Sequence, residues 1–401
     1  MPTIIVIGYR EDLDRALRSR DLDPYYLIQE PTNPPRNRRF ARVTDMEDAQ
    51  EVLRAVLAAG IAEPAGALSV HEMGVFTAAF LRQQLRLPGN ADPKGTLYFR
   101  DKCLQKSALP PDIRRARCRH VPPGTPFREL ADELGEPFVV KPANGAGALR
   151  TGVVRTPEEY ARALEPLSGA SDVQAVAESH VAAPEIYLDG VWDGGALRWS
   201  SLTRYHASPL SAVQGGVLAA HLMDERRHPD LFREARALAE RVLASLEAPD
   251  CVFHMEFFAV EQGLMFGECA IRLPGALSPQ AAHSTFGIDL FDAEISLALG
   301  EKPHVPLGDR PPERFHGYVL LRRPRQGELT QGDFERHFPF DMIEYSASPE
   351  VPAGPYGSVG RALVSERDEW KLRELIADIV RFNETGGAGK AWLPESAESP
   401  A

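Results

Sequence analysis

Apolar and polar residues alternate on both sides of a short turn within residues 251–275, which predicts two antiparallel strands. Because successive side chains of a strand point to opposite faces, Glu256 shares a face with His254, and Glu268 shares a face with Phe266 on the return strand. We therefore expect the two carboxylates to face each other across the hairpin. Carboxylates this close repel each other unless a shared proton or a bound cation separates them, and the alternative is two solvated glutamates on an edge hairpin.

Apolar runs and amphipathic segments alternate through the first 98 residues and predict a small α/β domain. The apolar runs at 3–7 and 67–70 have the composition of buried parallel strands. Doubly wound sheets of this kind bind ligands beyond the carboxyl ends of their strands, which makes Glu72 a candidate ligand contact. The alternative for Glu72 is a carboxylate that is stabilised at a helix N-terminus.

A glycine-rich segment, NGAGA, follows the predicted strand at 138–141 and precedes a second strand near residue 152. Backbone N–H groups beside Gly145 and Gly147 can approach an anion closely, and Lys141 offers a positive charge to the same anion. The segment lacks the GKS or GKT ending of a Walker loop. It predicts a phosphate-binding loop, and the alternative is a glycine hairpin with a surface lysine.

Two glutamates, Glu178 and Glu185, flank the connection that follows the predicted strand at 173–177. A nucleotide hinge needs one carboxylate and backbone groups for the adenine amino group, and a second carboxylate for the ribose hydroxyls. The pair fits these needs, and the alternative is two exposed glutamates beside a loop.

Composition narrows the class of protein. The net charge of −12 disfavours a nucleic-acid partner, and no apolar run approaches the roughly 18 residues of a membrane span. The N-terminus lacks the basic region of a signal peptide. Four cysteines without a CxxC pair predict reduced thiols in a cytoplasmic protein, with Cys251 and Cys269 as small buried packing residues.

The order and spacing of these segments resemble the ATP-grasp superfamily, in particular its carboxylate–amine ligases of the L-amino-acid ligase type. The resemblance covers most of the chain, from RLPGNADPKGTLYFRDKCLQK through FVVKPANGAGA and AESHVAAPE to FHMEFF…FGECAIRLPG and RRPRQGEL. It implies an ATP-grasp fold of the α/β (α+β) class with four parts: an N-terminal doubly wound domain at 1–98, linker helices and a lid subdomain at 99–185, a catalytic, metal-binding mixed-sheet subdomain at 186–310, and a C-terminal α+β unit at 311–401.

The resemblance also implies roles for individual residues. The nucleotide contacts would be Lys102 and Lys141 at the α- and β-phosphates, Gly145 and Gly147 in the loop that closes over the phosphates, Glu178 and the backbone through Val181 at adenine, and Glu185 at the ribose. Glu256 and Glu268 would bind one or two Mg²⁺ ions, for which Mn²⁺ can substitute. The remaining implied residues are Arg272 at the acyl-phosphate and tetrahedral species, His254 as a catalytic residue or substrate contact, and Glu72 and Arg204 as substrate contacts.

Two positions depart from the family pattern. The pattern Glu-x-Asn-x-Arg has Ala270 in place of the asparagine that helps to bind the second metal, and Ala148 stands where serine is frequent in the glycine loop. The implied function is an ATP-dependent ligase that forms an amide bond through an acyl phosphate, with amino-acid substrates and a possible homodimer. The alternatives are a carboxylase that activates bicarbonate, and a protein that binds nucleotide without turnover.

Overall fold

The computed structural model describes residues 1–30, 32, 37–61, 63–168, 174–306, 311–325, 327–348 and 354–387. The chain forms two compact units. The first comprises Met1–Leu202, Pro229–Pro274 and Ile288–Leu307, and the second comprises Thr203–His228, Gly275–Gly287 and Gly308–Ala401. The predicted domain boundary at residue 310 and the end of the chain after residue 387 lie outside the described residues.

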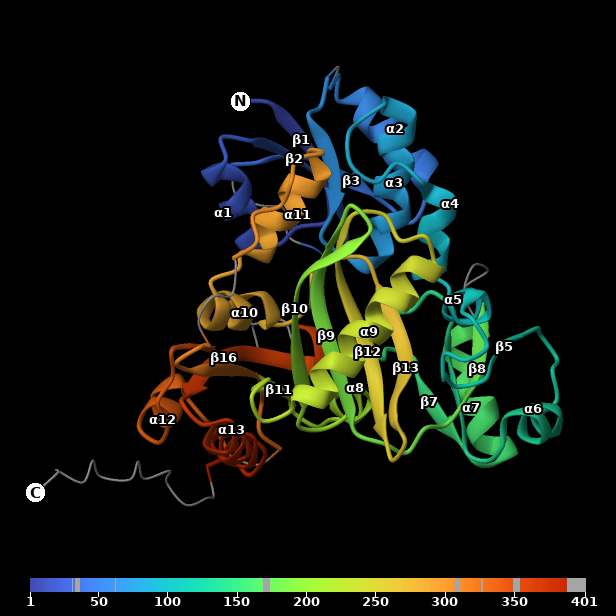
Figure 1. Ribbon diagram of the computed structural model, residues 1–401, viewed down its shortest axis with the longest axis vertical. Coiled ribbons are helices and arrows are strands. Elements are labelled where there is room, and N and C mark those ends of the chain that lie inside the picture. The colour runs from blue at the N-terminus through green and yellow to red at the C-terminus, as the bar shows by residue number, and fades with distance from the viewer. Residues whose placement is uncertain are drawn as a thin grey trace, which may run out of the picture. The chain divides into compact units, whose positions relative to one another are not determined.

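The first unit begins with a parallel four-stranded sheet in the order β3-β2-β1-β4. Its elements are β1 (Thr3–Ile7), α1 (Glu11–Ser19), β2 (Asp23–Gln29), β3 (Arg39–Val43), α2 (Ala49–Ala58), β4 (Gly66–Ser69), the 3₁₀ turn η1 (Glu72–Gly74) and α3 (Val75–Leu85). Helix α11 (Leu290–Ala298), distant in sequence, lies beside α1 (Figure 1). Arg20 joins the two helices by donating to Asp292 and Ser296. The predicted alternation of strands and helices is confirmed except at β3, an additional strand that follows β2 without a helix between them.

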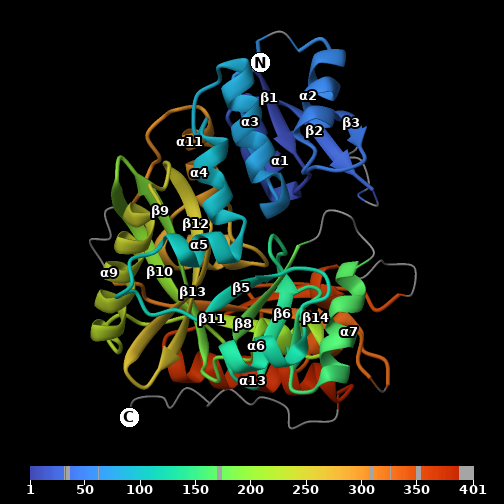
Figure 2. The same cartoon turned by 90° about the vertical axis from the view of Figure 1, so that its right-hand side faces the viewer.

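A second, antiparallel sheet in the same unit has the order β5-β8-β6-β7. Its elements are β5 (Cys118–Val121), α6 (Phe127–Leu134), β6 (Phe138–Pro142), β7 (Gly152–Val154), α7 (Pro157–Ser168) and β8 (Ala175–Ser179). Helices α6 and α7 lie beside this sheet (Figure 2). Phe127, Phe138 and Tyr160 form the aromatic centre of the core that the helices share with the sheet. The strand predicted from residue 173 is present from Ala175, and residue 173 itself lies outside the described residues. Between the two sheets in sequence come α4 (Pro93–Thr96), η2 (Leu97–Phe99) and α5 (Lys102–Ala108).

The predicted hairpin belongs to a third group of strands, ordered β13-β12-β9-β10. The bounds are β9 (Glu185–Asp193), β10 (Ala196–Tyr205), α9 (Pro229–Ser245), β12 (Cys251–Val260) and β13 (Gly263–Ala270). Glu256 lies directly opposite Glu268, as predicted. The register then shifts, so that Phe257 pairs with Phe266 and Gly267 is the extra residue of a β-bulge.

The bulge corrects one prediction. Paired residues share a face, so Phe266 lies on the buried face with Phe257 and not on the face of Glu268. Gly267 allows this arrangement, because a Cβ atom there would lie 2.9 Å from the backbone oxygen of Glu256. Strict alternation fails at a bulge, and the sequence alone did not reveal one.

The second unit is built on antiparallel strands in the order β11-β14-β16-β15. The bounds are α8 (Pro209–Val213), β11 (Leu218–Leu222), α10 (Ser278–Phe286), β14 (Phe315–Arg322), α12 (Gln331–Glu335), β15 (Met342–Tyr345), η3 (Pro355–Gly357), β16 (Ser358–Glu366) and α13 (Glu369–Glu384). The end of β10 pairs with β11 in this unit. Leu372, Ile376 and Ile379 of α13 pack into its core.

The prediction that all four cysteines are reduced thiols is wrong for two of them. Cys103 and Cys118 form a disulfide, because α5 and β5 bring their Cα atoms to 5.4 Å, a separation that a disulfide spans. Cys251 and Cys269 are free and buried, as predicted. Among the described residues, no helix is both long enough and apolar enough to cross a membrane.

Candidate active site

Helix α5 supplies three buried polar side chains to the candidate site. The helix begins at Lys102 because the Asp101 carboxylate caps it, accepting hydrogen bonds from the backbone N–H groups of the next turn. Lys102, Gln105 and Lys106 lie on the same face at spacings of three and four residues, and all three are buried. One short helix therefore contributes two ammonium groups and an amide to one buried face.

Glu178 accepts hydrogen bonds from two of the lysines. Lys106 Nζ lies 2.8 Å from its Oε1 atom and Lys141 Nζ lies 2.9 Å from its Oε2 atom. Burial alone would raise the pKa of Glu178, but the two ammonium groups outweigh burial and hold that pKa below its usual value. Both carboxylate oxygens of Glu178 are therefore engaged by lysines, and the adenine contacts of Glu178 and of the backbone through Val181 stay predictions.

The two glutamates of the hairpin are partly exposed and have cations beside them. Oε2 of Glu268 lies 3.7 Å from Lys102 Nζ and 3.8 Å from Lys141 Nζ. Burial would raise the pKa of Glu268, yet the lysines lower it to about 2. Oε1 of Glu256 lies 3.4 Å from His254 Nε2. Glu268 is therefore ionised, and both carboxylates have positive groups beside them.

His254 and Glu185 complete this group of charges. His254 Nδ1 lies 2.7 Å from Asp189 Oδ1. Burial would lower the pKa of His254, but the hydrogen bond and charge of Asp189, with those of Glu256, raise it to about 9. Burial raises the pKa of Glu185 to about 8, and the charges of Glu256 and Glu268 add to the effect. At neutral pH His254 is a cation and Glu185 is largely protonated.

The Glu256–Glu268 pair suits a magnesium ion that carries a nucleotide. The described residues contain no group of three or more His, Cys, Asp or Glu side chains placed to hold a metal. Mg²⁺ needs fewer protein ligands than that, because it usually keeps several waters and takes one or two carboxylates plus phosphate oxygens. Ala270 supplies no oxygen to this set. The donor set fits one ion bound partly through phosphate.

Arg272 is held by Glu72. Its Nε atom donates to Glu72 Oε2 at 3.0 Å, and Arg100 Nη1 donates to Glu72 Oε1 at 2.9 Å. Glu72 is buried and bridges the two arginines, so its observed role is to position Arg272. Arg100 also donates to the backbone oxygen of Asn144 in the glycine-rich segment.

The glycine-rich segment lies between β6 and β7, as predicted. The backbone oxygen of Gly145 accepts a hydrogen bond from Lys102 Nζ at 2.6 Å. Gly147 has a φ of +63° and is followed by Ala148 at +57°, so the backbone turns through the left-handed region there. Lys141, at the end of β6, connects this segment to Glu178 and Glu268.

The structure thus brings together most of the predicted site residues within the first unit. Arg204 belongs to the second unit, where its side chain is partly exposed and its Nε atom is buried without a hydrogen-bond partner among the described residues. Sequence reasoning missed Lys106, Gln105 and Arg100. A signal existed for Lys106, because it is one of only seven lysines and follows Lys102 by one helical turn.

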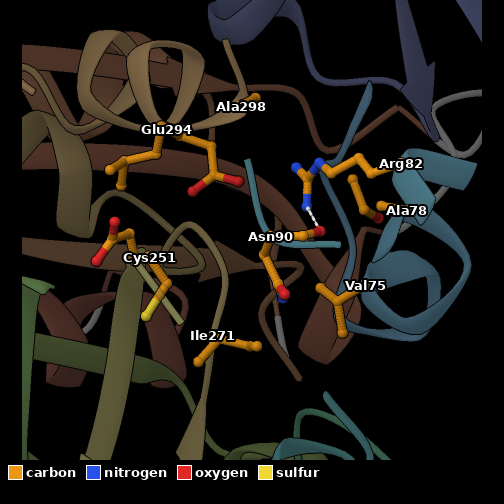
Figure 3. A pocket seen from close by; sticks show the side chains of 11 residues that line it. Val75, Ala78, Arg82, Asn90, Cys251, Ile271, Glu294 and Ala298 are labelled. Carbon is orange, nitrogen blue, oxygen red and sulfur yellow. Dashed lines mark hydrogen bonds between the residues drawn. The ribbon is translucent and has the colours of Figure 1, made fainter. Parts of the chain in front are cut away.

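A separate cavity of about 30 Å³ with a mixed polar and apolar lining lies elsewhere in the first unit, next to Arg82 and Glu294 (Figure 3). Arg82 donates to the backbone oxygens of Ala67 at 2.8 Å and of Asn90 at 3.2 Å. Burial raises the pKa of Glu294 to about 7, although the charge of Arg82 opposes the shift. The cavity has room for about two water molecules.

Comparison with known proteins supports the predicted resemblance. No protein-family model matches the chain. An L-arginine-specific L-amino acid ligase of Bacillus subtilis is 23% identical over 286 residues, which is 70% of this chain and 67% of the relative.

Solved structures agree in fold. The L-amino acid ligase of Bacillus licheniformis superposes with a TM-score of 0.71 at 17% identity, over 94% of this chain and 97% of that one. Carboxyaminoimidazole ribonucleotide synthase of Aspergillus clavatus, solved in complex with ATP, gives 0.74 at 14% identity over 96% and 99%. The chain therefore has the ATP-grasp fold and resembles the carboxylate–amine ligases that share it, as the sequence motifs predicted.

Proposed function

We propose that the chain is an ATP-dependent ligase that joins the carboxylate of an amino acid to an amine. The observation that carries the proposal is the meeting of Lys102, Lys141 and the Glu256–Glu268 pair in one unit, from three separate segments of the chain. The likeness to two L-amino acid ligases, one in sequence and one in fold, supports the choice of substrate class.

The chemistry requires an activated carboxylate. The γ-phosphoryl group of ATP is transferred to a carboxylate oxygen, so that ADP leaves and an acyl phosphate forms. The amine then attacks the carbonyl carbon, the bond to phosphate breaks, and the nitrogen loses a proton to give the amide. Phosphate is a far better leaving group than oxide, which is why the carboxylate is phosphorylated first.

Each residue has a role that follows from its charge and position. Lys102 and Lys141 would hold the phosphates. Glu72 accepts a hydrogen bond from Arg272 and would orient its guanidinium group towards the negative charge that develops during both steps. Glu256 and Glu268 would hold Mg²⁺, which when bound neutralises phosphate charge. The segment around Gly145 would close over the phosphates and exclude water, which would otherwise hydrolyse the acyl phosphate.

The test is phosphate release from ATP and Mg²⁺ across amino acids offered singly and in pairs, with the products read by mass. We expect one pair to release phosphate and to give the mass of both amino acids minus water. Glu268→Gln and Arg272→Ala should fold normally and lose nearly all turnover. Glu261→Gln is the matched control, because this exposed glutamate sits in the turn of the same hairpin.

Three outcomes would contradict the proposal. Full turnover in Glu268→Gln would remove the metal assignment. Phosphate release that depends on bicarbonate and not on an amine would favour the carboxylase alternative. Nucleotide binding without phosphate release for any acid would favour a binding protein, for which Ala270 would be the first residue to examine.

A further inference from the structure

Three consecutive backbone oxygens at the start of the glycine-rich segment accept hydrogen bonds from Arg100 and Lys102. The backbone N–H of Lys102 donates to the oxygen of Ala143 at 3.1 Å, and Lys102 Nζ donates to that of Gly145 at 2.6 Å. Between them, Arg100 Nη2 donates to the oxygen of Asn144 at 2.5 Å. The start of the segment therefore cannot shift unless these hydrogen bonds break or Arg100 and Lys102 move with it.

Arg100 also belongs to a chain of charged contacts that leads to Arg272. Arg100 Nη1 donates to Oε1 of Glu72 at 2.9 Å, and Arg272 Nε donates to Oε2 of the same carboxylate at 3.0 Å. Glu72 and Arg100 are only 7% and 5% exposed. Because Glu72 uses one oxygen for each arginine, a displacement of either arginine changes the position of the carboxylate that holds the other.

Glu47 completes this group of charges on the side of the glycine-rich segment. Its Oε1 atom accepts from Arg100 Nη2 at 3.0 Å and from the side-chain amide of Asn144 at 3.3 Å. Glu47 lies between β3 and α2, and its side chain is 31% exposed. Arg100 and Arg272 are thus matched by two carboxylates, and the loss of one member would leave a charge of opposite sign without its partner. We therefore expect the group to respond to a change as a unit.

We propose that Arg100 is a positioning residue that couples the glycine-rich segment to Arg272. The guanidinium that anchors Asn144 also holds Glu72, which in turn orients Arg272. The inference rests on the proposed function, in which the segment excludes water from the acyl phosphate and Arg272 faces the charge that develops on it. Coupling would orient Arg272 for the reaction only while the segment is anchored, which would limit hydrolysis of the acyl phosphate.

Trypsin cleavage after Arg150 measures the anchoring of the segment without ATP. Arg150 is exposed beyond the anchored start of the segment, and cleavage after Arg128, an exposed residue of α6, provides an internal reference in the same digest. When a segment opens and closes faster than it is cut, the cleavage rate follows the population of its open form. Relative to this reference, Arg100→Gln should speed cleavage after Arg150 at least tenfold, because it removes the contacts of the guanidinium with Asn144 and Glu72.

Glu47→Ala is a milder test that does not depend on a buried residue. It removes one acceptor of Arg100 and should speed cleavage after Arg150 at least threefold, with the melting temperature recorded for every variant. Glu63→Ala is the matched control, because this exposed glutamate lies in the same sheet domain outside the group. A residue that only anchored the segment would raise the KM for ATP alone, whereas coupling predicts that Glu47→Ala also lowers kcat. An unchanged kcat would overturn the coupling.

Pairs of variants test the coupling directly. Arg272→Ala should speed cleavage after Arg150 at least threefold, because Glu72 loses one partner and draws Arg100 away from Asn144. In an Arg100→Lys background the same change should have no further effect, because one ammonium group cannot reproduce the fork of contacts that a guanidinium makes. An effect of Arg272→Ala that is absent in the wild type, or equal in both backgrounds, would overturn the coupling.

The two proposals can fail separately. If the Arg100 variants do not fold, Glu47→Ala combined with Arg272→Ala tests the same link, and additive effects on cleavage would overturn it. Non-additive cleavage without phosphate release for any amino acid would support the coupling and remove the ligase reaction. Phosphate release together with additive cleavage effects would support the ligase reaction and remove the coupling.

Discussion

Replacing Gln105 with methionine should displace the backbone that carries Glu268 of the candidate metal site. The Gln105 amide is buried, donates from Nε2 to the backbone oxygens of Cys269 and Tyr98 at 2.8 Å each, and accepts from the backbone N–H of Cys269 at 2.9 Å. Cys269 directly follows Glu268 on β13, the edge strand of its group. Gln105 therefore pairs with this strand as a neighbouring strand would, and fixes the backbone that carries the Glu268 carboxylate.

The cost can be worked from these three hydrogen bonds. Methionine has a similar length but no amide, so Gln105→Met leaves one backbone N–H group and two carbonyl oxygens without partners. Each buried unsatisfied group costs about 1–3 kcal/mol, which gives roughly 3 kcal/mol at the lower end. At about 2–4 °C per kcal/mol for domains of 150–250 residues, the melting temperature should fall by about 6–12 °C. Turnover should fall roughly tenfold or more, because small displacements of catalytic groups are expensive.

The assay compares Gln105→Met with Gln262→Met, an exposed glutamine in the turn of the same hairpin. Thermal denaturation measures stability, and phosphate release over a range of Mg²⁺ concentrations measures the site. We expect a lower melting temperature and a weaker response to Mg²⁺ in Gln105→Met only. If both variants behave like the wild type, the reasoning is refuted. If stability falls while the Mg²⁺ dependence is unchanged, Gln105 supports the fold and not the position of Glu268.

Two further predictions concern stability. The pKa of Glu294 is about 7 in the folded protein and lower when the chain is unfolded, so its contribution to folding stability is fully present below the unfolded pKa and is lost as the pH rises through 7. Glu294→Gln should lack this loss of stability in melting curves recorded from pH 5 to 8. A pH profile like that of the wild type would contradict the prediction. Reduction of Cys103–Cys118, which are 15 residues apart, should destabilise the protein by about 3 kcal/mol, whereas a variant with serine at both positions should not respond to reductant.

The sequence predicted the placement of residues well where a local pattern sets it. Alternation along two strands placed Glu256 opposite Glu268, and the glycine spacing located the segment around Gly145 between strands. Prediction from the sequence failed where contacts join segments that are distant in the chain. Glu178 on β8 lies between Lys106 and Lys141 because α5 and β6 both meet β8 there, and no local pattern encodes that distance. The Cys103–Cys118 disulfide was missed for the same reason.

The charges in the candidate site indicate which groups are ready to accept a ligand. The contacts of Lys102 and Lys141 with Glu268 are long, at 3.7 and 3.8 Å, whereas Lys141 lies 2.9 Å from Glu178. Glu268 is therefore paired less closely than Glu178. A nucleotide with its cation would supply Glu268 with a closer positive charge and would give both lysines phosphate oxygens in exchange. Since Glu178 keeps Lys106, the exchange would leave that buried carboxylate paired throughout, which is a physical reason for a lysine on α5 in addition to Lys102 and Lys141.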